Sequence, residues 1–222
     1  MGGKGEAYKI LFLLFDWLAS IISFPFPTIV HRRDQVEATG SLLCILDSFS
    51  TAAVPDCVAA SGKVRYEVTV GLDMGLPQIG WATPAFERVD KRTGDGTGDD
   101  AHSWACDGAR RLAWHGGGGP GYDVTWAAED VIGVAADLDA GTLSFAKNGE
   151  WLEVYSGIDI GSGGGLFPSI SLKDGRCEVN LGAAPFKFPG PAPAYAPAAP
   201  QARALSRYRG EPGDFRGSFA TA

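Results

Sequence analysis

Hydrophobic and polar residues alternate along the middle of the chain. Residues 65–73 carry an apolar side chain at every second position, from Tyr66 to Leu72, and residues 176–181 repeat the pattern. Successive side chains of a β-strand point to opposite faces, so this period of two predicts strands with one buried face. No stretch between residues 35 and 190 keeps a helical period over a window of about 11 residues.

Turn signals separate the short apolar runs between these two stretches. They are Asp107-Gly108, Asp139-Ala140-Gly141, Asn148-Gly149 and Asp174-Gly175. Asn-Gly and Asp-Gly supply the positive φ angles that tight hairpin turns require. Four hairpins in succession predict an all-β fold, an antiparallel sandwich or barrel, for residues 35–190.

An apolar segment precedes this region. Residues 10–30 read ILFLLFDWLASIISFPFPTIV, and Pro25 and Pro27 end any helix near residue 24. About 15 helical residues span about 22 Å, short of the roughly 30 Å of a bilayer core. We therefore expect a hydrophobic N-terminal extension, residues 1–34, with a short helix. Three interpretations stay open: packing in an apolar groove of the domain or a partner, membrane association through residues 10–24, and a mispredicted start of the reading frame.

A Pro- and Ala-rich segment follows residue 190. It begins PAPAYAPAAP and continues as a mixture of Gly, Arg, Ser and Ala. Closely spaced prolines favour extended, unpacked chain. The sequence therefore predicts that residues 191–222 form a disordered linker or tail.

Composition and charge narrow the class of protein. The chain has 31 Gly and 14 Pro, which argues against a helical bundle. Residues 35–190 carry 11 Lys and Arg against 21 Asp and Glu, a net charge of −10. Because nucleic-acid binding needs a basic surface, we expect no nucleic-acid partner. An acidic domain attracts basic partners, and the same charge also maintains solubility.

The sequence indicates no catalytic residues, no metal site and no cofactor. Its four cysteines, Cys44, Cys57, Cys106 and Cys177, form no C-x-x-C pair, and none of the three histidines lies in a metal-binding motif. Gly94–Gly98 looks like a phosphate loop, but no Lys-Ser/Thr follows it. We expect free, mostly buried thiols in a reducing compartment and a cytoplasmic location.

A series of motifs between residues 36 and 188 occurs in a familiar order. Among them are Ile79-Gly80-Trp81-Ala82-Thr83, His102-Ser103-Trp104-Ala105-Cys106-Asp107-Gly108, Asp137-Leu138-Asp139-x-Gly141 and Glu178-Val179-Asn180-Leu181-Gly182. Together they resemble the SPRY domain, the core of B30.2 modules. The resemblance implies a bent, concanavalin-like sandwich of two antiparallel sheets, and a protein-interaction module in place of an enzyme. Trp81, Trp104, Phe145 and Phe167 are then expected in the core.

Three further segments extend the resemblance. Leu46–Ser50, Ser61–Lys63 and Gln78–Trp81 are similar to the SPRY segment of KPC-type RING ubiquitin ligases. This implies a substrate-recruiting adaptor in ubiquitin ligation. Four scattered cysteines cannot form the two-zinc cross-brace of a RING, so the chain is not expected to be the ligase itself.

The resemblance also implies where a partner binds. In peptide-binding SPRY domains the contacting loops correspond to 46–48, 92–98 and 173–175. We therefore expect a peptide or loop of a partner protein to contact Asp47, Ser48, Arg92, Thr93, Asp95, Lys173 and Asp174. The acidic charge of the domain favours a basic peptide. The peptide-binding subfamily has a bulky aromatic residue where this chain has Asp174. We therefore expect the same loops to bind a partner, but not the same peptide. Tyr122, Trp126 or Trp151 could add an exposed aromatic anchor.

Two other functions are carried as alternatives. One is lectin-like carbohydrate binding, because lectins share the sandwich architecture and Trp114 or Trp126 could stack on a sugar. The other is a membrane-tethered adaptor, with residues 10–24 as the anchor.

Overall fold

The computed structural model describes residues 41–46, 49–87, 95–160, 163–191, 194–202 and 205–208. These residues form strands and no helix. The strands are β1 (Leu42–Leu46), β2 (Ser50–Ala53), β3 (Lys63–Val70), β4 (Gln78–Ala82), β5 (Ser103–Asp107), β6 (Leu112–Trp114), β7 (Val131–Asp137), β8 (Thr142–Lys147), β9 (Glu150–Tyr155), β10 (Phe167–Leu172), β11 (Gly175–Asn180), β12 (Ala196–Pro197) and β13 (Ser206–Tyr208). The expected N-terminal helix lies outside the described residues.

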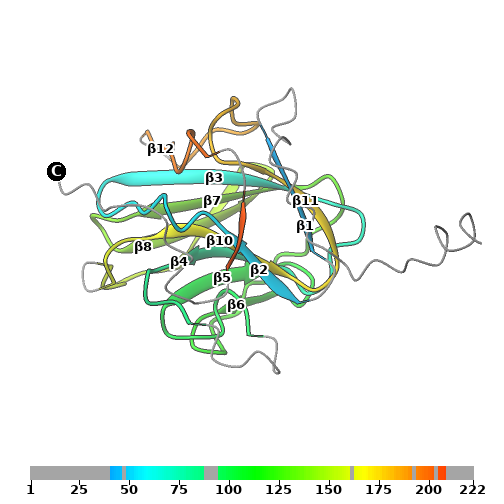
Figure 1. The fold of residues 1–222 in the computed structure, drawn as a ribbon, viewed down its shortest axis with the longest axis horizontal. Helices are drawn as coiled ribbons and strands as arrows, with labels where there is room; N and C mark the ends of the chain where they lie inside the picture. Colours follow the sequence, from blue (N-terminus) through cyan, green and yellow to red (C-terminus); the bar gives the residue numbers. More distant parts are fainter. Residues whose placement is uncertain are drawn as a thin grey trace, which may run out of the picture. The chain divides into compact units, whose positions relative to one another are not determined.

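Two sheets form the fold, as two layers in Figure 1. The first sheet has the order β1-β11-β3-β7-β8-β9, and β12 also pairs with β3. The second has the order β13-β2-β10-β4-β5-β6. Every pairing is antiparallel except that of β12 with β3. The all-β antiparallel architecture predicted from the alternation and the turns is therefore confirmed.

Large side chains from both sheets fill the space between them. Tyr66 of β3, Phe145 of β8 and Trp81 of β4 are fully buried there, and Trp104 of β5 is 7% exposed. Phe167 of β10 is also fully buried, but on the other face of the second sheet, in a cluster with Ala53, Ala82 and Phe86. All four aromatic residues predicted to be buried are therefore buried. Burying an aromatic side chain removes much apolar surface from water, which is the main stabilising contribution to such a core.

A hydrogen bond joins the two sheets inside this core. The Tyr66 hydroxyl of β3 donates to the carbonyl oxygen of Gly80 in β4, at 2.5 Å. The Tyr66 ring also meets Trp81 edge to face, with 5.1 Å between centroids. At Gly80 a Cβ atom would lie 1.9 Å from the carbonyl oxygen of Trp104. Only glycine therefore allows β4 to approach β5 this closely.

Three of the four predicted hairpins are present. They connect β5 to β6, β7 to β8, and β8 to β9. Asn148 and Gly149 both have positive φ, as their turn requires. The fourth prediction is wrong, because β10 and β11 belong to different sheets. Asp174-Gly175 turns the chain from one sheet to the other. A hairpin turn and a crossing between sheets have the same local sequence signal.

Strand β3 also differs from its predicted pattern. It ends at Val70, and Leu72 is 71% exposed although the alternation places it on the buried face. Arg65 and Glu67, on the opposite face, are buried at 8% and 3% exposure because residues 186–188 cover them. The alternation of apolar and polar residues predicts which face of the sheet a side chain points to. It does not predict where strand pairing ends or which residues cover the outer face of the sheet.

Two strands fall in the segment for which the composition predicts a disordered tail, residues 191–222. β12 continues beside β3 where β11 ends, and β13 pairs with the edge of β2. Ala199, between them, is fully buried and its N–H donates to Leu181. Extended backbone is what proline favours, and it is also what strand pairing requires. For the rest of that segment the expectation stays a prediction.

The inter-sheet hydrogen bond can be tested by Tyr66→Phe. The change keeps the ring but removes the donor to the buried Gly80 carbonyl, so we expect a loss of about 1 to 2 kcal/mol in the free energy of unfolding. Urea denaturation measures it. Tyr195→Phe, on a half-buried ring, is the matched control and should change stability by less. Equal stability of both variants would contradict the role given to this bond.

Acid stability can be tested at Asp137. A hydrogen bond from Lys63, at 2.5 Å, holds the pKa of this carboxyl below its usual value. A lowered folded-state pKa adds stability above the unfolded Asp pKa of about 3.9, and this contribution is lost as the pH falls through the folded-state pKa. We expect Asp137→Asn to reduce the difference in urea midpoint between neutral and acidic solution. The exposed Asp73→Asn is the control, and an undiminished difference in Asp137→Asn would contradict the assignment.

Candidate functional site

Several connections between strands meet at one end of the sandwich. The β10–β11 connection, residues 173–174, is central because Leu172 pairs with Ser50 and Gly175 pairs with Leu46. The end of β1 and the start of β2 therefore lie beside it. Ser171 pairs with Gln78 on its other side, so the β3–β4 connection, residues 71–77, arrives there too.

Backbone hydrogen bonds join two of these connections. The Lys173 N–H donates to the carbonyl of Gly75 at 2.7 Å, and the Gly75 N–H donates to the carbonyl of Asp174 at 2.9 Å. Gly175 has a φ of 104°, and a Cβ there would lie 2.1 Å from the carbonyl oxygen of Asp73. The close contact of these loops therefore requires glycine at position 175.

A cluster of buried hydroxyls fixes part of the β4–β5 connection, residues 95–99, to the same end. The Ser171 hydroxyl accepts the Thr97 N–H at 2.8 Å and contacts the Thr51 hydroxyl at 2.7 Å. The Thr97 hydroxyl lies 2.7 Å from that of Ser169. All four side chains are fully buried. We refer to Thr51, Thr97, Ser169 and Ser171 as the hydroxyl cluster.

Asp99 closes the same loop. Its carboxylate accepts the Gly96 N–H at 2.7 Å and the Gln78 side-chain amide at 2.8 Å. Burial raises the pKa of Asp99, and these hydrogen bonds oppose that effect. A Cβ at Gly96 would lie 2.7 Å from both the Gln78 side-chain oxygen and the Ser171 hydroxyl, so a larger residue would push the loop outward.

The structure brings the described members of the predicted site to this end. Lys173 and Asp174 are exposed in the central connection. Asp95 lies two residues before Thr97, which the hydroxyl cluster holds next to β10. Asp47, Ser48, Arg92 and Thr93 lie outside the described residues. Their part in binding stays a prediction, as does that of the other three.

Sequence reasoning missed two apolar residues at this end. Leu72 is 71% exposed and Leu76 is 39% exposed, both in the 71–77 connection. Exposed large apolar side chains beside a polar rim are typical of interaction surfaces. The signal was present, since Gly71, Gly75 and Pro77 mark this stretch as a loop, but the alternation continued past Gly71 and suggested a longer strand.

The candidate aromatic anchors are buried or partly buried. Tyr122 is 1% exposed, so it is part of the core and not an anchor. Trp151 is partly buried, packs near Gly133 and donates to the carbonyl of Pro189. The guanidinium of Arg110 lies 4.4 Å from the ring centre of Trp114, so one face of that candidate sugar platform is occupied. Trp126, partly buried, meets Tyr122 edge to face.

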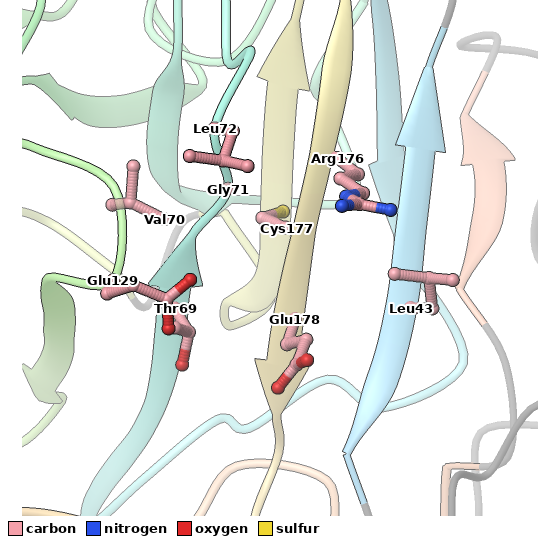
Figure 2. Close-up of a pocket in the computed structure, with 9 residues that line it drawn as sticks. All are labelled: Leu43, Thr69, Val70, Gly71, Leu72, Glu129, Arg176, Cys177 and Glu178. Atoms are coloured by element: carbon pink, nitrogen blue, oxygen red, sulfur yellow. The ribbon is translucent and has the colours of Figure 1, made fainter.

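A shallow pocket of about 270 Å³ opens beside this end, on the outer face of the first sheet. Figure 2 shows its strands, β1, β11 and the end of β3, with Leu72 and Arg176 toward one end of the pocket and Glu129 and Glu178 toward the other. At Gly71 a Cβ would lie 2.0 Å from the carbonyl oxygen of Arg176. This close approach places the 71–77 connection at the pocket rim.

Within the described residues no three His, Cys, Asp or Glu side chains are arranged to hold a metal ion. That part of the chain contains no helix long and apolar enough to cross a membrane. Residues 10–24 lie outside the described residues. The four cysteines are free, and Cys44, Cys106 and Cys177 are buried. Burial raises the pKa of the Cys106 thiol.

Two antiparallel sheets that carry a set of interlocked loops at one end define a β-sandwich of the recognition type, in which a rigid scaffold presents loops. Residues 63–184, more than half of the chain, match the SPRY domain, and the chain belongs to that family. SPRY domains are generally protein-interaction modules. The family resemblance found in the motifs is confirmed.

One curated relative of the chain is a ubiquitin ligase. The E3 ubiquitin-protein ligase RKP of Arabidopsis thaliana is 42% identical over 144 residues. The match covers 64% of this chain and 11% of the ligase. The similarity to the SPRY segment of ubiquitin ligases therefore concerns one part of a much longer protein.

The hydroxyl cluster can be tested by Ser171→Ala. The change leaves the buried Thr97 N–H without its acceptor, so we expect a loss of about 1 to 3 kcal/mol in the free energy of unfolding. Hydrogen exchange should also become faster at residues 95–102 than elsewhere in the fold. The exposed Ser156→Ala is the matched control. Unchanged exchange at residues 95–102 in Ser171→Ala would show that the cluster does not hold this loop.

Proposed function

We propose that this domain binds a short segment of a partner protein through the connections at residues 71–77, 95–100 and 173–174. The observation that carries the proposal is that these loops are bonded to one another or to β10, while the connections at 71–77 and 173–174 present exposed side chains. Backbone hydrogen bonds join Gly75 to Lys173 and Asp174, and the hydroxyl cluster holds Thr97. A loop that is ordered before binding loses less conformational entropy when the partner arrives.

The exposed side chains give the surface a mixed character. Leu72 and Leu76 supply apolar area, whereas Lys173 and Asp174 supply charge of both signs. Apolar contact with a polar rim is the usual composition of a protein-binding surface. Membership of a family of interaction modules supports the same proposal.

We further propose that the domain recruits a substrate or a regulatory protein to ubiquitin ligation. The support is the 42% identity to part of an E3 ubiquitin-protein ligase. The shared part covers 11% of that ligase, and we assign to this domain the recognition of a partner and not the ligase reaction. A cytoplasmic site of action is part of this proposal. Carbohydrate binding and a membrane tether stay predictions, and no observation on the described residues favours either.

The proposed surface can be tested with a triple variant. Leu72→Ser, Lys173→Ala and Asp174→Ala together remove exposed side chains from two connections, so we expect the partners captured by the full chain in a pull-down to be lost. Exposed substitutions of this kind each change stability by about 0.5 kcal/mol or less. The thermal midpoint should therefore stay close to that of the unmodified chain.

A second triple variant provides the control. Glu150→Ala, Leu152→Ser and Glu153→Ala alter exposed residues of β9, at the far edge of the first sheet. This variant should retain the captured partners. Loss of partners from both variants, or from neither, would contradict the placement of the site, and captured sets without ubiquitin-ligase components would contradict the adaptor role.

A further inference from the structure

The outer face of the first sheet is covered over one part of β3. Both carboxylate oxygens of Glu67 accept backbone N–H groups, from Lys187 at 2.8 Å and from Phe188 at 3.0 Å. The Arg65 guanidinium lies 3.9 Å from the ring centre of Phe186 and donates to the carbonyl of Phe188. The segment Phe186-Lys187-Phe188 thus lies on this part of the face.

The same face is open one row further along the strands. Thr69 of β3 pairs with Glu178 of β11, which pairs with Leu43 of β1, so these three side chains form a row across the sheet. The pocket of about 270 Å³ lies over this row. The contact of residues 186–188 with the sheet reaches as far as this row, where the Lys187 ammonium donates to the Thr69 hydroxyl at 3.1 Å.

The pocket is lined by three charged side chains, Glu129, Arg176 and Glu178, and the Lys187 ammonium lies beside it at Thr69. In the part of the chain that the structure describes, Asp130 and Asp137 form ion pairs with lysines, whereas Glu129, Glu178 and Arg176 form none. All three side chains are exposed. Glu129 and Glu178 lie toward one end of the pocket and Arg176 toward the other (Figure 2).

We propose that this pocket receives a basic side chain from an extended segment of the partner, a proposal that rests on the function proposed above. Glu129 and Glu178 attract the cationic group, and repulsion by Arg176 keeps it at their end of the pocket. The aliphatic stem of a lysine or arginine packs against Leu72, which has 71% of its surface free.

Two observations support a basic occupant over an acidic one. The neighbouring part of the face already holds Lys187 of the chain itself, between two phenylalanines. Residues 35–190 also carry a net charge of −10, which draws basic segments toward the domain before contact. The pocket adjoins the 71–77 connection, so one bound segment can contact both the loops and the sheet face.

The test uses a phage-displayed library of random linear peptides selected on the full chain. Enriched peptides are synthesised, and their affinities are measured by fluorescence polarisation for the unmodified chain, Glu178→Lys, and Glu153→Lys on β9 as the matched control. We expect enriched peptides to contain Lys or Arg next to an apolar residue, and Glu178→Lys to weaken binding by about tenfold through like-charge repulsion. Glu153→Lys should change affinity less than twofold, within about 0.4 kcal/mol.

A charge exchange separates direct contact from altered folding. Replacing the basic residue of an enriched peptide by glutamate should restore its affinity for Glu178→Lys and reduce that for the unmodified chain. Binding to the unmodified chain should also weaken as ionic strength rises. Equal effects of Glu178→Lys and Glu153→Lys, failure of the charge exchange, or enriched peptides without basic residues would overturn the pocket assignment.

The same peptides distinguish the two proposals. If Leu72→Ser, Lys173→Ala and Asp174→Ala together abolish binding while Glu178→Lys does not affect it, the loops bind without the pocket and only this inference fails. If neither variant affects binding, or if no peptide is enriched, both proposals fail.

Discussion

The hydrogen bond from the Tyr66 hydroxyl to the Gly80 carbonyl joins the two layers on which the rest of the structure depends. A hydroxyl in the middle of an apolar core is costly unless it is paired, so the two strands must keep the spacing that makes this 2.5 Å contact. The edge-to-face contact with Trp81 and the absence of a side chain at Gly80 fit that same spacing. Once the layers are fixed, the connections at one end have defined positions.

Those connections reverse the usual distribution of polar and apolar groups. The hydroxyl cluster is polar and fully buried beneath the loops, whereas Leu72 and Leu76 are apolar and exposed on them. Buried hydroxyls that satisfy one another give a loop a single conformation, because each displaced partner would leave an unpaired group. The 71–77 connection is held separately, by the backbone hydrogen bonds of Gly75, and it exposes Leu72 and Leu76. The hydroxyl cluster therefore orders one loop, and Leu72 and Leu76 supply the apolar surface on another.

Much of the fold could be predicted from local signals, because alternation and Asn-Gly or Asp-Gly turns act over a few residues. The predictions failed where the outcome depends on distant chain. Gly71 ends β3 through its close approach to Arg176, and Asp174-Gly175 links two sheets because β10 finds its partners in β2 and β4. Glu67 is buried by backbone groups of residues 187 and 188. The loops at 92–98 and 173–175 came from the family resemblance, whereas Leu72 and the pocket required the arrangement of the strands.

The pairing of β2 with β13 has a consequence for synthesis of the chain. Ala53 pairs with Ser206, so one neighbour of β2 emerges from the ribosome only after about 150 further residues. At about 5 to 20 residues per second, that edge stays unpaired for about 8 to 30 s. An unpaired strand edge is a template for pairing with other chains. The nascent domain therefore passes through an aggregation-prone interval that closes when its last strand arrives.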